Sequence, residues 1–222
     1  MGANIHPTAI VERGAELADG VDIGPFCTIG PKVKLAEGVR LLSHVSISGN
    51  THVGARTILY PFSALGHPPQ DLKYKGEDTR LRVGADNIIR ENVTFHLGTV
   101  VGRSETTVGD KGFFMAASHV GHDCVIGDGV VVGNGTLLGG VATVEDYVIL
   151  GGNAAVHQFG RIGKYAFIGG GSPIVGDVIP FGMAIGNRAN RYGLNIVVLK
   201  RKGFPREQIH ELGQAYRMLF SS

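Results

Sequence analysis

Residues 120–155 read VGHDCV IGDGVV VGNGTL LGGVAT VEDYVI LGGNAA when they are written in groups of six. Each group begins with an aliphatic residue, and Gly follows it directly in all groups but one. The same period runs from Ile5 to Leu65, resumes from Val83 to Val101, and after one seven-residue step continues from Val108 to Ile174. A period of six is neither the helical nor the simple strand period. A repeat of this length does not arise by chance.

This period is typical of a short strand followed by a corner. Three such units close a triangular turn, and successive turns stack at about 4.8 Å. The aliphatic residue of each unit then points inward, while Gly fits corners that need a positive φ or a close backbone approach. The pattern is the hexapeptide repeat of left-handed parallel β-helices. We therefore expect an all-β solenoid with an α tail: a left-handed parallel β-helix of hexapeptide repeats followed by a short C-terminal helical segment.

Two polar stretches interrupt the repeat, residues 66–82 (the first insertion) and residues 101–107 (the second insertion). Both are expected to leave the prism as loops, where functional residues tend to lie. We expect a β-helix catalytic domain over residues 1–186 that contains both insertions.

The repeat ends near Pro180, and residues 187–222 are expected to form a helical segment. From Asn190 the apolar spacing is helical, up to Gly203. A second helix is expected after Pro205, because Pro is favoured at the first helical position. Its apolar face is formed by Ile209, Leu212, Tyr216 and Leu219.

The composition and net charge give no support to several classes of protein. The 222 residues include 35 Gly, two Cys and no Trp, and the formal net charge is +2. A net charge this close to zero does not indicate binding to nucleic acid or to a membrane surface. No apolar run is long enough for a membrane-spanning helix. Two cysteines make no disulfide framework, and the N-terminal residues do not resemble a signal peptide. These features favour a cytoplasmic protein.

One ridge of the predicted prism carries candidate chemistry. With eighteen residues per turn, His122, Gly140 and Gln158 stack in one column, and Asp123 follows His122 directly. A neutral imidazole is a natural general base near pH 7, and an adjacent carboxylate orients it. A glycine N–H is open to a developing oxyanion. A surface histidine without catalytic role remains the alternative on spacing alone.

A metal site is a further alternative. His96, His119 and His122 could supply three imidazoles to zinc, as in zinc hydratases built on this repeat. Their spacing differs from such sites, so we expect no metal.

Five stretches then point to a family. The chain resembles the acyl-carrier-protein-dependent UDP-N-acetylglucosamine O-acyltransferases, which catalyse the first step of lipid A synthesis. The matching stretches are Pro69–Glu77, Ile89–Thr94, His119–Cys124, Ala155–Phe159 and the region from Leu194 to Phe204.

The resemblance implies three catalytic roles. His122 is the general base that removes the proton of the sugar 3-hydroxyl, Asp123 is its supporting carboxylate, and Gly140 offers its N–H to the oxyanion. The alkoxide attacks the thioester of a 3-hydroxyacyl group on acyl carrier protein. No metal or other cofactor is implied beyond the phosphopantetheine arm of that donor.

The resemblance also implies the binding residues. The nucleotide sugar is contacted by Gln70, Asp71, Lys73, His96, His119, His157 and Gln158. The nucleotide end and its phosphates are held by Asn195, Arg201 and Lys202. The length of the acyl chain is set at Gly170 and Arg188. The partners implied are acyl carrier protein, the UDP-sugar and two further copies of the chain, with sites between the subunits of a homotrimer in the bacterial cytoplasm.

The sequence departs from the family pattern at some of these places. Val141 stands where the family usually has a His that helps to hold the sugar, Leu97 replaces an Arg after His96, and Lys202 replaces the second Arg of a pair. Two alternatives therefore stay open: N-acylation of a 3-amino or other glucosamine nucleotide, and a hexapeptide scaffold without catalytic activity.

Overall fold

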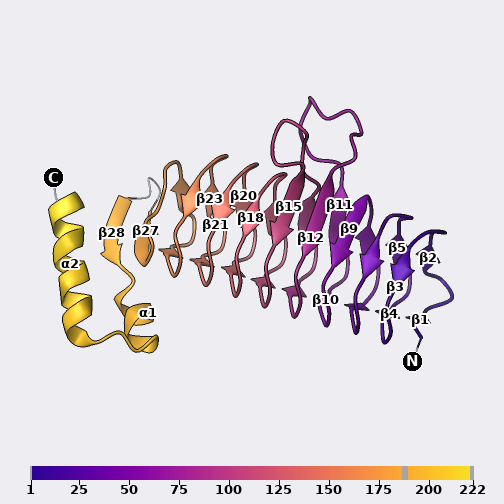
Figure 1. Cartoon of the computed structure of the whole chain (residues 1–222), viewed down its shortest axis with the longest axis horizontal. Helices are drawn as coiled ribbons and strands as arrows, with labels where there is room; N and C mark the ends of the chain where they lie inside the picture. The colour runs from indigo at the N-terminus through magenta and orange to yellow at the C-terminus, as the bar shows by residue number, and fades with distance from the viewer. Residues whose placement is uncertain (1, 187–189, 221–222) are drawn as a thin grey trace.

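The chain forms an elongated prism of stacked coils with a helical tail at its C-terminal end (Figure 1). The computed structural model describes residues 2–186 and 190–220. The coils follow one another from the N-terminus, and looped segments stand out from the middle of the prism. The predicted all-β solenoid with an α tail, a left-handed parallel β-helix, is confirmed.

Three sheets form the faces of the prism, and each takes every third strand of the solenoid. The first comprises β1 Asn4–Ile5, β4 Asp22–Ile23, β7 Arg40–Leu41, β10 Ile58–Leu59, β13 Ile88–Ile89, β16 Phe113–Phe114, β19 Val131–Val132, β22 Ile149–Leu150, β25 Phe167–Ile168, β27 Gly182–Ile185 and β28 Asn190–Leu194. The second comprises β2 Ile10–Val11, β5 Thr28–Ile29, β8 Ser46–Ile47, β11 Ala64–His67, β14 Thr94–His96, β17 His119–Val120, β20 Leu137–Leu138, β23 Ala155–Val156 and β26 Pro173–Ile174. The third comprises β3 Glu16–Leu17, β6 Lys34–Leu35, β9 Asn50–Val53, β12 Arg80–Val83, β15 Glu105–Val108, β18 Val125–Ile126, β21 Thr143–Val144 and β24 Arg161–Ile162.

The register shows how the insertions leave the stack. Where the period is unbroken, parallel partners are eighteen residues apart, as are His119 and Leu137. Across the first insertion Asn50 pairs with Arg80, and across the second Thr94 pairs with His119. The loops that leave the prism are shorter than the insertions predicted from the sequence, because residues 66–67, 80–82 and 105–107 belong to β11, β12 and β15 and stay in the sheets. Val101, which the period predicted to point inward, lies in the second loop and is 74% exposed.

The core is a single column of aliphatic side chains along the prism axis. Residues such as Ile29, Leu59 and Val132 are at most 1% exposed. Its aromatic members Phe95 and Phe114 pack edge to face, with ring centroids 4.8 Å apart. Because strands of two residues make few ladder bonds, burial of this column is the main stabilising term.

Glycine and positive φ have separate roles at many corners. Gly24 and Gly127 directly follow an aliphatic residue, and a β-carbon on either would lie closer than 3.0 Å to the backbone of the next coil. Neither has a positive φ, whereas sixteen described non-glycine residues do, among them Asp123 and Val141. The glycine after the aliphatic residue is thus required for close approach of the coils.

The tail is not helical throughout, which corrects the expectation of helix from Asn190. Residues 190–194 form β28, which pairs antiparallel with β27 at the end of the first sheet. The backbone hydrogen bonds that these residues make with the open edge of β27 outweigh the weak preference for a helix that their side-chain spacing indicates. Helix α1 (Ile196–Arg201) begins after Asn195, whose side chain accepts the Val198 N–H, and α2 spans Arg206–Phe220. No described helix is both long and apolar enough to cross a membrane.

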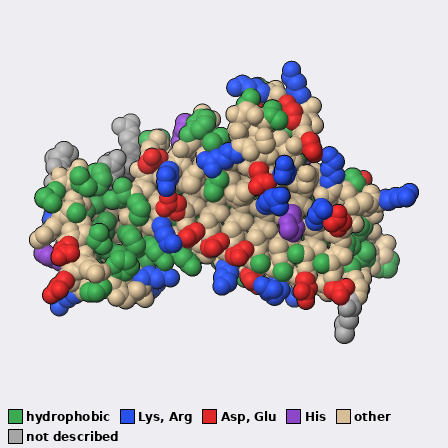
Figure 2. Space-filling model, in the orientation of Figure 1, with side chains coloured by type: hydrophobic (Ala, Val, Ile, Leu, Met, Phe, Trp, Pro, Cys, Tyr) green, Lys and Arg blue, Asp and Glu red, His purple; other side chains and the backbone are tan. Residues whose placement is uncertain are grey.

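An aromatic ladder holds this tail against the prism. The rings of Tyr147, Tyr165 and Phe181 stack at about 5 Å on successive coils, and Phe204 meets Phe181 edge to face. The Lys202 ammonium lies 4.4 Å from the centre of the Tyr147 ring. Hydrophobic side chains gather over the tail, whereas charges of both signs alternate along the prism (Figure 2).

Candidate active site

An open groove of about 800 Å³ lies where the two insertions meet the corner that carries His122. It brings residues from distant parts of the sequence to one place. It is lined by Gln70, Asp71, Leu72, Lys73, Thr99, Val101, Gly102, Arg103, His122, Val141, Gln158 and Phe159.

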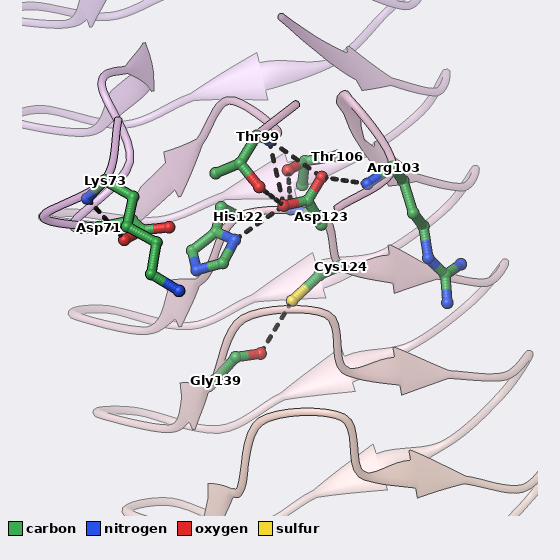
Figure 3. Close-up of polar contacts among 9 residues, drawn as sticks. All are labelled: Asp71, Lys73, Thr99, Arg103, Thr106, His122, Asp123, Cys124 and Gly139. Carbon is green, nitrogen blue, oxygen red and sulfur yellow. Dashed lines mark hydrogen bonds and ion pairs between the residues drawn. The ribbon is translucent and has the colours of Figure 1, made fainter. Parts of the chain in front are cut away.

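His122 and Asp123 are consecutive corner residues whose side chains have opposite exposures. Asp123 has a φ of 61°, a left-handed conformation that Asp tolerates, and its side chain is fully buried. The His122 side chain is 23% exposed and reaches the groove. Its Nδ1 lies 2.8 Å from Oδ2 of Asp123 (Figure 3).

The carboxylate of Asp123 is held by several donors. The Thr99 hydroxyl donates to Oδ2 at 2.6 Å, the Thr99 N–H lies 3.0 and 3.1 Å from the two oxygens, and the Arg103 N–H donates to Oδ1 at 2.7 Å. Burial alone would raise the pKa of Asp123, but the hydrogen bonds from Thr99, His122 and Arg103 keep that pKa below its ordinary value. Asp123 is therefore ionised at neutral pH.

The ionised state of Asp123 determines the tautomer of His122. A carboxylate has no proton to donate, so Nδ1 of His122 must carry the hydrogen that the pair shares. Nε2 is then left with its lone pair. This is the arrangement of a general base that is oriented by a buried carboxylate.

Gly140 lies directly below this imidazole on the next coil. A β-carbon on Gly140 would be closer than 3.0 Å to Nε2 of His122. Among the described residues, the Gly140 N–H makes no hydrogen bond. The site thus combines a base with an adjacent free backbone donor, as acyl transfer requires.

The register places Gln158 in the same column, one coil beyond Gly140. Its side chain is exposed and contributes to the groove. Gly121, Gly139 and His157 form the neighbouring column, and His157 is exposed with its Nδ1 3.0 Å from the Gln158 carbonyl oxygen. His157 does not line the groove of this single chain.

The first insertion forms the opposite wall of the groove. Gln70, Asp71 and Lys73 contribute to it, and Oδ1 of Asp71 accepts the Lys73 N–H at 2.9 Å. The Lys73 side chain lies beside His122 in Figure 3. An ion pair between Lys32 and Asp78, at 2.9 Å, ties the insertion to an earlier coil.

His96 and His119 pack next to the site but do not line the groove. Their rings meet edge to face at 4.7 Å, and Nδ1 of His119 lies 2.7 Å from the Thr94 hydroxyl. Burial, followed by the neighbouring histidines, lowers the pKa of His96 to about 4. Burial also lowers the pKa of His119. Both rings are therefore neutral at pH 7. No group of three or more His, Cys, Asp or Glu residues in the described ranges is arranged to hold a metal ion.

The remaining predicted residues lie outside the groove of one chain. Asn195 is 4% exposed and caps α1, while Arg201 and Lys202 follow at the end of that helix. Gly170 is an exposed corner residue that stacks on Gly152, in a column other than that of His122. Arg188, predicted with Gly170 to limit the acyl chain, lies outside the described residues.

Sequence reasoning missed the residues that surround Asp123. Thr99 and Arg103 supply hydrogen bonds to the carboxylate, and Gly102 packs against it. The second insertion is visible in the sequence as a break in the repeat, but no spacing rule indicates which side chain a loop of that length covers. Leu72 and Phe159 were also missed as groove residues, since exposed apolar side chains carry no periodic signal.

Comparison with known proteins places the chain in a family. Residues 177–222 match the family described as UDP-N-acetylglucosamine O-acyltransferase, domain 2, and residues 105–140 match the bacterial transferase hexapeptide family. A protein from Rhizobium johnstonii named acyl-[acyl-carrier-protein]–UDP-N-acetylglucosamine O-acyltransferase is 47% identical over 98% of this chain and 80% of its own length. A protein of the same name from Thermodesulfovibrio yellowstonii is 50% identical over 97% of this chain and 84% of its own.

Solved structures agree with these relatives. The structure of LpxA from Acinetobacter baumannii superposes with a TM-score of 0.97 at 42% identity, covering 98% of this chain and 84% of that one. The UDP-N-acetylglucosamine acyltransferase of Arabidopsis superposes with a TM-score of 0.86 at 37% identity, covering 98% and 83%.

Proposed function

The chain belongs to the acyl-[acyl-carrier-protein]–UDP-N-acetylglucosamine O-acyltransferase family, and on that basis we propose that it transfers a 3-hydroxyacyl chain from acyl carrier protein to the 3-hydroxyl of UDP-N-acetylglucosamine. This reaction is the first step of lipid A synthesis. The observation that carries the proposal is the His122–Asp123 pair in an open groove, with Nε2 directly over Gly140.

The reaction follows from this geometry. Nε2 of His122 takes the proton of the sugar 3-hydroxyl as the oxygen attacks the thioester carbonyl. The imidazolium that forms is stabilised by Asp123, and the Gly140 N–H donates to the oxyanion of the tetrahedral intermediate. The carbon–sulfur bond then breaks, the acyl group stays on the sugar oxygen, and the thiolate of the phosphopantetheine arm takes the proton from His122. The base is thereby regenerated without any other cofactor.

The walls of the groove suggest how the acceptor is held. Asp71 offers a carboxylate and Lys73 an ammonium group on the side facing His122, and Gln158 offers an amide below it. Such groups match the hydroxyl, acetamido and phosphate groups of a UDP-sugar. The apolar side of the groove, with Val141 and Phe159, suits the alkyl part of the donor.

A homotrimer with sites between subunits is part of the proposal. Asn195, Arg201 and Lys202 lie away from the groove of their own chain, so they would act on a substrate held by a neighbouring copy. Large apolar side chains on the second sheet support such packing, because Ile10 and Leu137 are 62% and 51% exposed there. Gly170 and Arg188 are proposed to limit the acyl chain, and the bacterial cytoplasm is the proposed location.

An acyl-transfer assay tests the function. The purified protein is mixed with a series of 3-hydroxyacyl carrier proteins and UDP-N-acetylglucosamine, and the product is identified by mass spectrometry. We expect a monoacylated nucleotide sugar whose mass reports the chain length, and its formation about a hundredfold or more slower with His122→Ala. An alkali-stable amide formed only with the 3-amino analogue would support the N-acylation alternative, to which Val141 points. No transfer to either acceptor, and no binding of either, would support the scaffold alternative.

A further inference from the structure

We infer that Thr99 is a positioning residue of the His122–Asp123 pair, and that Thr99, Gly102 and Arg103 form a carboxylate clamp that holds the pair in its working geometry. The carboxylate clamp is built by the chain just before and within the second insertion. The catalytic part of this inference rests on the proposed function, but the geometry of the clamp does not.

The hydroxyl of Thr99 and Nδ1 of His122 converge on the same carboxylate oxygen. Oδ2 of Asp123 accepts from the Thr99 hydroxyl at 2.6 Å and from His122 at 2.8 Å. Thr99 is 3% exposed, and Asp123 is fully buried. A donor on the same oxygen fixes the direction of its remaining lone pair, and thus the plane of the imidazole that uses it.

Backbone donors hold the other oxygen of the carboxylate. The Arg103 N–H donates to Oδ1 at 2.7 Å, and the Thr99 N–H is shared between both oxygens. The Asp123 N–H itself donates to the Thr106 hydroxyl at 2.8 Å. The carboxylate therefore cannot rotate without losing hydrogen bonds in a buried place, which is costly.

Gly102 closes the clamp from above. A β-carbon at Gly102 would lie closer than 3.0 Å to all three atoms of the Asp123 carboxylate group. Gly102 has no positive φ, so the requirement for glycine here comes from the carboxylate and not from the backbone. The second insertion thus covers a buried negative charge with closely fitting backbone that also donates hydrogen bonds to it.

Thr99→Val is the decisive variant, because valine keeps the shape and the N–H but removes the hydroxyl. With one donor fewer, Oδ2 carries more uncompensated charge, so the His122 imidazolium is favoured and the acidic limb of the kcat/KM profile moves to higher pH. The freed carboxylate also orients the imidazole less well. We expect kcat/KM to fall about tenfold, with KM for the sugar nucleotide unchanged.

Other groups near His122 could affect the same profile. They are Asp123 on its own corner, His96 on β14, His119 on β17, Asp71 and Lys73 on the first insertion, and Arg103 on the second. None of them is changed by Thr99→Val. Thr99→Ser restores the hydroxyl and is expected to recover both the rate and the profile.

Thr136→Val is the matched control. Thr136 is also fully buried, and its hydroxyl donates to the Gly151 carbonyl at 2.9 Å, away from the groove. It should keep the wild-type rate and profile. Wild-type kinetics in Thr99→Val would overturn the inference. A second result would also overturn it: Thr99→Val loses rate without a shift in the pH profile, and Thr99→Ser does not restore that rate. Altered packing alone would then explain the loss.

A second readout does not depend on catalysis. The ¹⁵N shifts of the His122 ring, assigned by comparison with His122→Gln, report its tautomer in the folded protein. The same shifts follow protonation of the ring as the pH is lowered. We expect the Nδ1–H form in both proteins, because Asp123 stays ionised, and protonation at a higher pH in Thr99→Val. If the wild type transfers no acyl group but protonation of the ring shifts in this way, the proposed function fails and the clamp stands. An unchanged titration of the ring in Thr99→Val rules out the clamp whatever the enzyme does.

Discussion

The imidazole of His122 occupies the space that a side chain on Gly140 would need. The two residues are not neighbours in the chain, but the eighteen-residue register of the coils stacks one on the other. The glycine therefore has two consequences at once: it leaves room for the base, and it leaves its own N–H uncovered next to it. Acyl transfer needs both groups within reach of one carbonyl carbon.

Gly140→Ala is expected to displace the His122 ring and lower kcat by about a hundredfold or more. The fold should survive, because the atoms that the new methyl meets belong to a partly exposed side chain. Steady-state kinetics and thermal unfolding check both parts. Gly152→Ala, at a corner where the nearest atom is 3.3 Å away, is the control and should stay active. Equal activity of the two variants would contradict the stacking argument.

His122→Ala is expected to lower the rate of acyl transfer by about 10²–10⁴-fold, since a general base typically contributes that much. The melting temperature should fall only slightly, because Thr99 and Arg103 still donate to the Asp123 carboxylate. His52→Ala, an exposed histidine on β9 of the third sheet, serves as the matched control. Acyl transfer at the wild-type rate by His122→Ala would show that His122 is not the general base.

Val141 is the only β-branched residue among the described non-glycine residues with positive φ, at 65°. A β-branched residue is strained there, whereas Asn adopts this conformation readily. Val141→Asn should therefore raise the stability by about 1 kcal/mol, or the melting temperature by about 2–4 °C. Calorimetry measures the change. Val131→Asn, in strand β19, should instead lower the melting temperature, and a fall in both variants would refute the strain.

Acid should destabilise the fold through His96. The pKa of His96 is about 4 in the folded chain against its ordinary 6.5. Between these values the unfolded chain binds a proton that the folded chain does not, so stability falls as the pH drops from about 6.5 to 4. The loss from this residue is at most about 3 kcal/mol.

Urea unfolding at several pH values tests this dependence. His96→Gln should flatten the slope of stability against pH within that window, whereas His52→Gln should not, because His52 is exposed. A slope that is the same in the wild type and in His96→Gln would show that burial of His96 is not its cause.

Most of the prism could be predicted from the sequence. The six-residue period placed the inward residues, because each coil repeats the same local geometry and pairs with the next at a constant offset. The tail could not be predicted in the same way. Residues 190–194 have helical spacing, but they become a strand because β27 presents an open edge to them.

Within the site, the spacing of the residues was enough to predict the column of His122, Gly140 and Gln158, because successive coils pair at a constant offset of eighteen residues. The neighbouring Asp123 followed from adjacency. The groups that surround that carboxylate could be identified only from the folded chain. Thr99 and Arg103 reach the carboxylate because the connection from β14 to β15 stacks on the corner of the next coil, and an irregular loop has no period from which such a contact could be calculated.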